Sequence, residues 1–252
     1  MIRTGLCSVT FRKLAPSAIV ALAKQGQLDA IEWGGDVHVP HGDVKAARTI
    51  RRMMCDEGLE IPSYGSYYRV GQAQERFEDV VSSALILGAP VIRVWAGTIG
   101  SPQATGATWD SVIEDSRRCA AMAQAEGLRI AFEYHGNTLT DTDEAAIRLL
   151  TDVNHPAVNC YWQMRDSTVS LSEHLDSLRS ILPWLEHVHV QATRDGQRVP
   201  LETQAGTWQR ILGVVASTGR DHTAMLEFVH DDSPEQFLAD AAMLRSLRGD
   251  IR

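Results

Sequence analysis

Residues 127–135 read GLRIAFEYH and join a helix end, a strand and a polar strand terminus in one short segment. Gly127 is typical of the residue that follows a helix, because glycine readily adopts the left-handed backbone conformation needed there. The run Arg129–Tyr134 has the length and apolar character of a buried strand. A second such junction, GLEI at residues 58–61, indicates that the chain repeats a helix-to-strand unit.

Similar runs recur along the whole chain, with longer amphipathic stretches between them. The runs predicted to be strands are Thr4–Val9, Leu28–Trp33, Leu59–Gly65, Val91–Trp95, Arg129–Tyr134, Ala157–Trp162, His187–Val190 and Ala224–Val229. Eight units in 252 residues leave about 31 residues for each strand and its returning helix, which is close to the minimum for such a unit. We therefore predict an α/β fold, a closed (β/α)8 barrel, as a single domain over residues 1–252. A doubly wound open sheet is the alternative.

The stretches between these runs have helical spacing and helix end signals. Asp43–Glu57 and Trp109–Glu126 each stop at a glycine, and Thr207–Ser217 stops near Gly219. Ser233 followed by Pro234 predicts the start of the last helix, because proline is favoured at the first helical position.

Composition limits the classes of function. Formal net charge is −8, and this acidic balance argues against nucleic acid and against an anionic membrane as partner. No apolar run approaches the length of a membrane span, and the N-terminus lacks the pattern of a signal peptide. The four cysteines show no CxxC pair and read as free thiols in a reducing compartment. We expect a cytoplasmic protein.

Four successive strands place a possible metal ligand near the same rim of the predicted barrel. Glu133 shares an inward face with Ala131 and His135, because side chains alternate along a strand. Gln163 ends the next run, HVHVQ at 187–191 places two histidines and Gln191 on one face, and Glu227 lies among apolar neighbours. Buried carboxylates need partners. The set Glu133, Gln163, His189 and Glu227 is therefore predicted to bind one divalent ion, Mn²⁺, Mg²⁺, Co²⁺ or Zn²⁺. His187 is expected to pack one layer below His189.

The loops of the first half supply aromatic and hydrogen-bonding groups that suit a sugar or polyol, whose C–H face is apolar and whose hydroxyls are polar. Packing of the barrel mouth is the alternative role of these side chains, and Arg69 and Arg194 could instead be solvated. The predicted substrate-binding residues are His38, Tyr68, Arg69, Trp95, His135 and Arg194.

The whole chain resembles the xylose-isomerase-like TIM barrels, a family of sugar epimerases, sugar-phosphate isomerases, inosose-processing enzymes and endonuclease IV. The resemblance rests on FEYH at 132–135, HVHV at 187–190 and LEF at 226–228. It implies that Glu133, His189 and Glu227 bind the metal. The family usually has Asp where Gln163 stands, followed three residues later by His, where this chain has Asp166. Gln163 lowers the anionic charge of the site by one, and Asp166 is the alternative ligand.

The resemblance implies an isomerase or epimerase in which the metal ion polarises a carbonyl and stabilises an enediolate, with Glu133 and Glu227 as base and acid. A lyase or dehydratase acting on a keto-inositol or keto-glycoside is the alternative, because the same enediolate can expel a neighbouring substituent. A nuclease and a sugar-binding barrel without metal are less favoured. Barrels of this family often pair, so a homo-oligomer is also expected.

Overall fold

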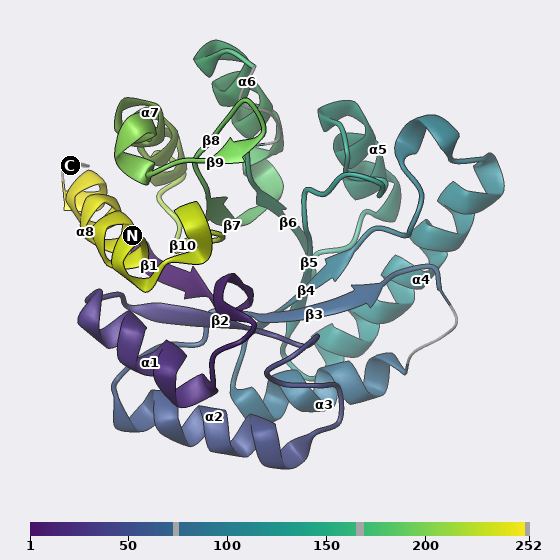
Figure 1. Ribbon diagram of the computed structural model, residues 1–252. Helices are drawn as coiled ribbons and strands as arrows, with labels where there is room; N and C mark the ends of the chain where they lie inside the picture. The colour runs from purple at the N-terminus through teal and green to yellow at the C-terminus, as the bar shows by residue number, and fades with distance from the viewer. Residues whose placement is uncertain (73–75, 165–168, 250–252) are drawn as a thin grey trace.

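The computed structural model describes residues 1–72, 76–164 and 169–249, and within these ranges eight parallel strands close into a barrel (Figure 1). Their order around the barrel is β1-β10-β7-β6-β5-β4-β3-β2. The strands are β1 (Ile2–Cys7), β2 (Ala30–Gly34), β3 (Tyr64–Arg69), β4 (Val91–Trp95), β5 (Arg129–Phe132), β6 (Val158–Trp162), β7 (Leu185–Val190) and β10 (His222–Leu226). The predicted (β/α)8 barrel is confirmed.

Helices follow the strands and cover the outside of the barrel (Figure 1). They are α1 (Pro16–Gln25), α2 (Val44–Asp56), α3 (Phe77–Leu87), α4 (Gly106–Ala125), α5 (Asp143–Val153), α6 (Leu171–Ile181), α7 (Ala205–Ala216) and α8 (Pro234–Gly249). The loop between β7 and α7 carries an extra antiparallel hairpin, β8 (Thr193–Arg194) and β9 (Gln197–Arg198), which the hydrophobic pattern does not predict.

The two repeated helix-to-strand junctions have the geometry that their glycines allow. Gly58 and Gly127 have positive φ angles of 65° and 74°. In both junctions the residue after the glycine donates its backbone N–H to a carbonyl five residues earlier, which closes the helix in a Schellman-type turn. A residue with a Cβ atom would be strained at these angles. The same local chemistry therefore ends α2 and α4 and turns the chain back into the barrel.

Helix starts follow capping side chains. Asp43 accepts a hydrogen bond from the backbone N–H of Ala46 at 2.9 Å and so caps α2. α4 begins at Gly106, three residues before the predicted Trp109, because Thr105 caps it earlier. The start of α8 at Pro234 agrees with the prediction.

β3 begins later than predicted, at Tyr64 instead of Leu59. Pro62 has no N–H for a strand ladder. The segment before it joins β2 only through an isolated bridge between Ala30 and Glu60 among the described residues. The strand therefore starts after the proline and continues to Arg69, which brings its last residues to the mouth of the barrel.

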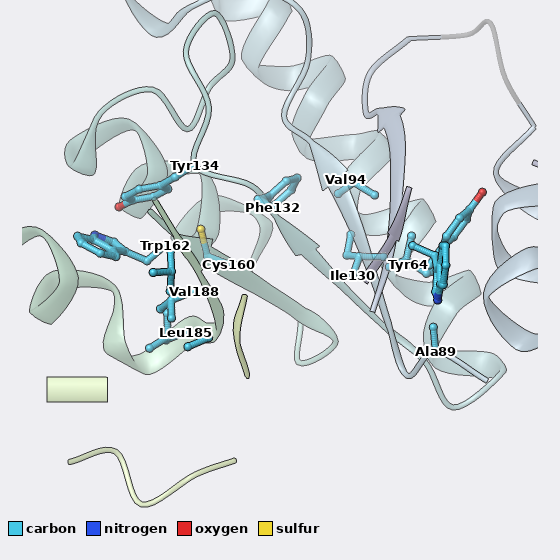
Figure 2. Close-up of a cluster of buried hydrophobic side chains, with 14 of the residues drawn as sticks. Tyr64, Ala89, Val94, Ile130, Phe132, Tyr134, Cys160, Trp162, Leu185 and Val188 are labelled. Carbon is cyan, nitrogen blue, oxygen red and sulfur yellow. The ribbon is translucent and has the colours of Figure 1, made fainter. Parts of the chain in front are cut away.

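Side chains of the strands alternate between two layers. Ile130 and Phe132 of β5 belong to the large core between the barrel and its helices, part of which Figure 2 shows. Ala131 belongs to a smaller cluster inside the barrel. In β7, Val188 and Val190 occupy the outer core. Each fully buried side chain of this size contributes roughly 1.5–3 kcal/mol, so the alternation fixes which side chains point inward at the strand ends.

Two further findings concern the chain as a whole. Within residues 1–72, 76–164 and 169–249, no helix has the length and apolar character needed to cross a membrane. All four cysteines are free thiols; Cys7, Cys119 and Cys160 are buried and Cys55 is exposed.

Candidate functional site

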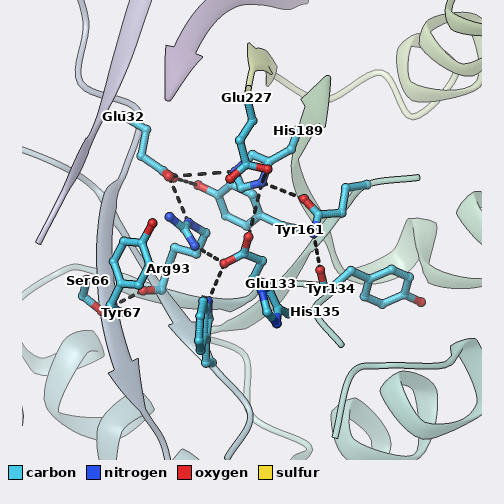
Figure 3. Close-up of polar contacts among 12 residues, drawn as sticks. Glu32, Ser66, Tyr67, Arg93, Glu133, Tyr134, His135, Tyr161, His189 and Glu227 are labelled. Carbon is cyan, nitrogen blue, oxygen red and sulfur yellow. Dashed lines mark hydrogen bonds and ion pairs between the residues drawn. The ribbon is translucent and has the colours of Figure 1, made fainter. Parts of the chain in front are cut away.

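Polar side chains from four strands converge at the C-terminal end of the barrel. Glu133 follows β5, Gln163 follows β6, His189 lies in β7 and Glu227 follows β10. Figure 3 shows Glu133, His189 and Glu227 pointing toward one another. Active sites of this fold lie at this end, because the loops that follow the strands gather there. The structure thus brings together all four side chains predicted to hold a metal ion.

The donor atoms of these side chains surround Nδ1 of His189. Oε1 of Gln163 lies 3.0 Å from Nδ1, Oε2 of Glu227 lies 3.3 Å from it, and Oε1 of Glu133 lies 3.6 Å from it. Ligands bound at about 2.1 Å to one ion are themselves separated by about 3.0 Å in octahedral geometry and about 3.4 Å in tetrahedral geometry. The chemistry of these donors and the distances of the three oxygens from Nδ1 suit a divalent ion.

A buried arginine lies beside the predicted ligands. Nε of Arg93 donates to Oε1 of Glu32 at 2.9 Å, and Nη1 of Arg93 forms a short ion pair with Oε2 of Glu133. Glu32 and Glu133 therefore share one guanidinium, and the three carboxylates of the cluster outnumber its single arginine when His189 is neutral, as it must be to bind an ion. A divalent ion would supply the missing charge, as buried carboxylates require.

The pKa values of this cluster follow from burial and from Arg93. Burial alone would raise the pKa of Glu133, but the charge of Arg93 and hydrogen bonds from its neighbours lower that pKa to about 2. Burial likewise opposes ionisation of Glu32, and Arg93 again holds its pKa below the ordinary value. The pKa of the Arg93 guanidinium is raised well above its usual value by Glu133 and Glu32, against the effect of burial. Both carboxyl groups are therefore ionised at neutral pH.

Hydroxyl and indole groups complete the hydrogen bonding of these carboxylates. Ser63 and Tyr161 donate to Oε2 of Glu32 at 2.7 Å and 3.1 Å. Nε1 of Trp95 donates to Oε2 of Glu133 at 2.5 Å. These donors fix the orientation of the carboxylates, which is the role that residues around a metal ligand commonly have.

Aromatic groups form one wall of the mouth around Trp95. The ring of His135 stacks on the indole at 4.2 Å, the guanidinium of Arg69 lies 4.1 Å from its centroid, and Tyr67 packs against it at 5.4 Å. The structure therefore places three predicted substrate-binding residues, Arg69, Trp95 and His135, in one group. Tyr67 joins them although the predicted set contains Tyr68.

The remaining predicted substrate-binding residues lie elsewhere. Tyr68 is 1% exposed, packs on Phe77 of α3, and its hydroxyl accepts a hydrogen bond from Arg118 of α4. His38 is buried, with Nδ1 at 3.0 Å from the hydroxyl of Ser8. Both are thus engaged in packing outside the cluster around His189.

Two predicted residues remain to be located, Arg194 and Asp166. Arg194 is exposed in the β8–β9 hairpin. Asp166, the alternative ligand, lies outside the described residues.

Several residues of the site are absent from the predicted sets of metal-binding and substrate-binding residues. Arg93 and Glu32 are charged residues inside apolar strands, and this was the available signal, because a buried charge requires a partner. Cys7 gave no such signal, since a single cysteine in a strand is usually a small apolar residue. Its Sγ lies within 4.8 Å of donor atoms of His189 and Glu227.

The fold and this cluster define a (β/α)8 barrel with a candidate metal site at its mouth. The family model described as "Xylose isomerase-like TIM barrel" matches residues 20–247. The chain therefore belongs to the xylose isomerase-like TIM barrel family.

Known proteins with similar sequences or structures include enzymes of more than one reaction type. A 3-dehydroshikimate dehydratase from Bacillus anthracis is 25% identical over 197 residues, which cover 73% of this chain and 70% of the relative. The crystal structure of a probable 3-DHS dehydratase from Bacillus anthracis has a TM-score of 0.81 at 21% identity and covers 97% of this chain and 99% of its own. A barrel protein from Mycobacterium smegmatis in complex with magnesium has a TM-score of 0.77 at 16% identity, with 99% and 98% covered. A D-psicose 3-epimerase from Clostridium cellulolyticum H10 has a TM-score of 0.75 at 14% identity, with 99% of both chains covered.

Proposed function

We propose that this chain is a divalent-metal-dependent enzyme that removes a proton next to a carbonyl group of a small hydroxylated substrate and then eliminates water. The observation that carries the proposal is the convergence of three oxygen donors, from Glu133, Gln163 and Glu227, on Nδ1 of His189 at 3.0–3.6 Å. The magnesium complex of a similar barrel supports the binding of a metal ion. Mn²⁺, Mg²⁺, Co²⁺ and Zn²⁺ all suit the mixed oxygen and nitrogen set.

When bound, the ion would polarise the substrate carbonyl and stabilise negative charge that develops on its oxygen. Glu133, Gln163, His189 and Glu227 would hold it. Gln163 contributes a neutral oxygen, and its own orientation is fixed because Nε2 of Gln191 donates to that oxygen at 3.3 Å. The amide also reaches the backbone carbonyl of Tyr134.

Glu227 is the group best placed to move the proton. Its Oε2 accepts from Gln191 at 3.2 Å, and Oε1 has no hydrogen-bond partner among the described residues. Glu133 differs, because Arg93 and Trp95 both donate to its Oε2 while Oε1 faces His189. Glu133 is therefore better suited to hold the ion than to exchange protons with the substrate, which refines its predicted role as a second acid or base.

Arg93 offers a donor for the substrate. Its Nη2 atom is buried and lacks a hydrogen-bond partner among the described residues. Space for this group exists because residue 65 is glycine; a Cβ there would lie 2.6 Å from Nη2. An enolate or carboxylate oxygen of the substrate would satisfy this N–H, and a charged donor in a water-poor site stabilises such an oxygen strongly.

One base is sufficient for elimination. Glu227 takes the proton on the carbon next to the carbonyl, the electrons of the C–H bond form a carbon–carbon double bond, and the hydroxyl on the following carbon leaves with that proton as water. Epimerisation would require a second proton donor on the opposite face of the substrate. Because Glu133 is engaged by Arg93 and Trp95, the geometry favours the lyase, and the sequence similarity to a 3-dehydroshikimate dehydratase supports the same choice.

The test is a comparison of substrates with defined products. Protein freed of metal by chelation is supplied with Mn²⁺, Mg²⁺, Co²⁺ or Zn²⁺ and incubated in deuterated water with 3-dehydroshikimate, keto-inositols and keto-sugars. We expect metal-dependent loss of water from one of these compounds. Isomers that retain all oxygen atoms and carry solvent deuterium would instead establish the epimerase or isomerase predicted from the sequence.

Variants separate the roles of the residues. Glu227→Gln should abolish proton removal, whereas Gln163→Ala should weaken metal binding first. Glu57→Gln is the matched control, because Glu57 is exposed at the C-terminal end of α2 and is not one of the residues of the site. Turnover that survives complete metal removal, or that persists in Glu227→Gln, would refute the proposal.

A further inference from the structure

A sulfur atom borders the proposed metal site. Cys7 ends β1 and is fully buried in the cluster inside the barrel, together with Ala131, Tyr161 and Met225. Its Sγ, a ring nitrogen of His189 and a carboxylate oxygen of Glu227 lie within 4.8 Å of one another. These three donor atoms therefore lie close enough together to bind one ion.

His189 provides a second observation at the same place. Its side chain is fully buried, and Nε2 has no hydrogen-bond partner among the described residues. Oε1 of Glu32 lies 3.8 Å from Nε2, and Glu32 pairs in register with Cys7 across β1 and β2. A buried ring nitrogen without a partner requires an explanation, of which a bound ion is one, and here it lies on the side of the imidazole that faces the β1–β2 edge.

We propose that Cys7, His189 and Glu227 form a second binding mode of this centre, which takes thiophilic divalent ions such as Zn²⁺ and Cd²⁺. Mn²⁺ and Mg²⁺, which prefer oxygen, use Glu133, Gln163, His189 and Glu227. The inference rests on the metal centre of the proposed function and adds a sulfur ligand to it.

The two modes follow from the preferences of the ions. Thiolate selects soft ions, and carboxylate and amide oxygens select hard ones. When a soft ion binds, the S–H bond of Cys7 breaks, a sulfur–metal bond forms and the proton leaves to water. Glu133 then stays paired with Arg93. Because His189 and Glu227 belong to both sets, the modes exclude each other, and a thiophilic ion displaces Mn²⁺ from the centre.

The probe is Cd²⁺, titrated into chelator-treated protein while the thiolate-to-metal absorption in the near ultraviolet is recorded. We expect the wild type to show a cadmium–thiolate absorption band and Cys7→Ser to lack it. The affinity of Cys7→Ser for Cd²⁺ should be lower than that of the wild type by at least about tenfold. The affinity for Mn²⁺, measured by calorimetry, should be the same in both proteins. Cys160→Ser is the matched control, because Cys160 is equally buried but lies in the outer core (Figure 2).

A wild type that binds Cd²⁺ without the band, or a band that persists in Cys7→Ser, would overturn the inference. If Cys7→Ser fails to fold, zinc-edge X-ray absorption of the wild type gives the answer, since a sulfur neighbour is expected at about 2.3 Å from the zinc. Mn²⁺ binding distinguishes the two proposals: Mn²⁺ bound without a cadmium–thiolate band refutes the sulfur mode alone, whereas no binding of either ion refutes the metal centre itself.

Discussion

Nε of Arg93 donates to Oε1 of Glu32 at 2.9 Å, and both side chains are only 1% exposed. The same guanidinium reaches Glu133 through Nη1. One buried cation therefore connects β2, β4 and the end of β5 directly below the mouth of the barrel. The position of Glu133 is set by this connection, so the ion pair affects both stability and the geometry of the proposed metal site.

Removing the charge of Glu32 should destabilise the fold strongly. In Glu32→Gln, Arg93 stays buried but keeps only one of its two charged carboxylate partners, Glu133. Breaking a buried ion pair in this way typically costs about 3–5 kcal/mol of the free energy of unfolding. The free energy of unfolding from urea titration measures the effect. Asp176→Asn is the control, because the Arg179–Asp176 pair is exposed and such pairs contribute at most about 1 kcal/mol. Equal losses in the two variants would contradict the prediction.

The stability of the fold should decrease in mild acid because of His222. Burial lowers the pKa of this histidine below its ordinary value of 6.5, so the folded state binds fewer protons than the unfolded state. Its contribution is therefore complete above about pH 6.5 and is lost as the pH falls toward the folded-state pKa. Unfolding free energies measured from about pH 7.5 to about pH 5.5 should fall less steeply in His222→Gln than in the wild type. Parallel curves would show that His222 does not contribute.

Much of the fold can be predicted from the sequence because it depends on interactions between residues that are close together in the chain. Glycine at the helix ends, the cap at Asp43 and the two-residue period of β5 and β7 each specify their structure with few neighbours. The start of β3 was mispredicted because the apolar run Leu59–Gly65 contains Pro62, and the missing N–H outweighs the hydrophobic pattern. The β8–β9 hairpin has too few apolar residues to produce a pattern.

The candidate site can be predicted only in part from the sequence, for a different reason. The inward direction of side chains at strand ends follows from the period of two, which is why the sequence predicts that Glu133, His189 and Glu227 lie close together. Arg93 and Glu32 come into contact with each other only when the barrel closes. No residue spacing in the sequence predicts this contact. Near Tyr67 the alternation itself fails, because this residue has a φ of 60° and the register shifts between Gly65 and Arg69.

Replacing Gln163 by aspartate should strengthen metal binding. The Gln163→Asp change replaces a neutral oxygen that lies 3.0 Å from Nδ1 of His189 by a charged one on a side chain one methylene group shorter, and it adds the negative charge that the family usually has there. We expect the dissociation constant for Mn²⁺ to fall by roughly tenfold, as measured by calorimetry on chelator-treated protein. An unchanged constant would mean that residue 163 does not contact the ion.

Substitutions of Tyr67 and Tyr68, the neighbouring tyrosines of β3, should affect different properties: catalytic activity in one case and the free energy of unfolding in the other. Tyr67 packs on Trp95, so Tyr67→Leu is expected to lower kcat/KM by about tenfold, which corresponds to the value of about 1.4 kcal/mol for an aromatic contact. Tyr68 packs on Phe77 outside the barrel, so Tyr68→Leu should mainly lower the free energy of unfolding, by about 2–4 kcal/mol. The opposite assignment of effects would restore Tyr68 as the substrate contact.

The hydrogen bond from Trp95 to Glu133 should matter for the reaction and little for substrate binding. Trp95→Phe keeps an aromatic ring against His135 and Arg69 but removes the N–H that reaches Oε2 of Glu133 at 2.5 Å. A hydrogen bond to a charged group contributes about 1.5–3 kcal/mol, so kcat should fall by about tenfold to a hundredfold while KM changes little. Trp95→Leu removes the ring as well and should raise KM too. If Trp95→Phe raised KM and left kcat intact, Trp95 would act through the substrate and not through the orientation of Glu133.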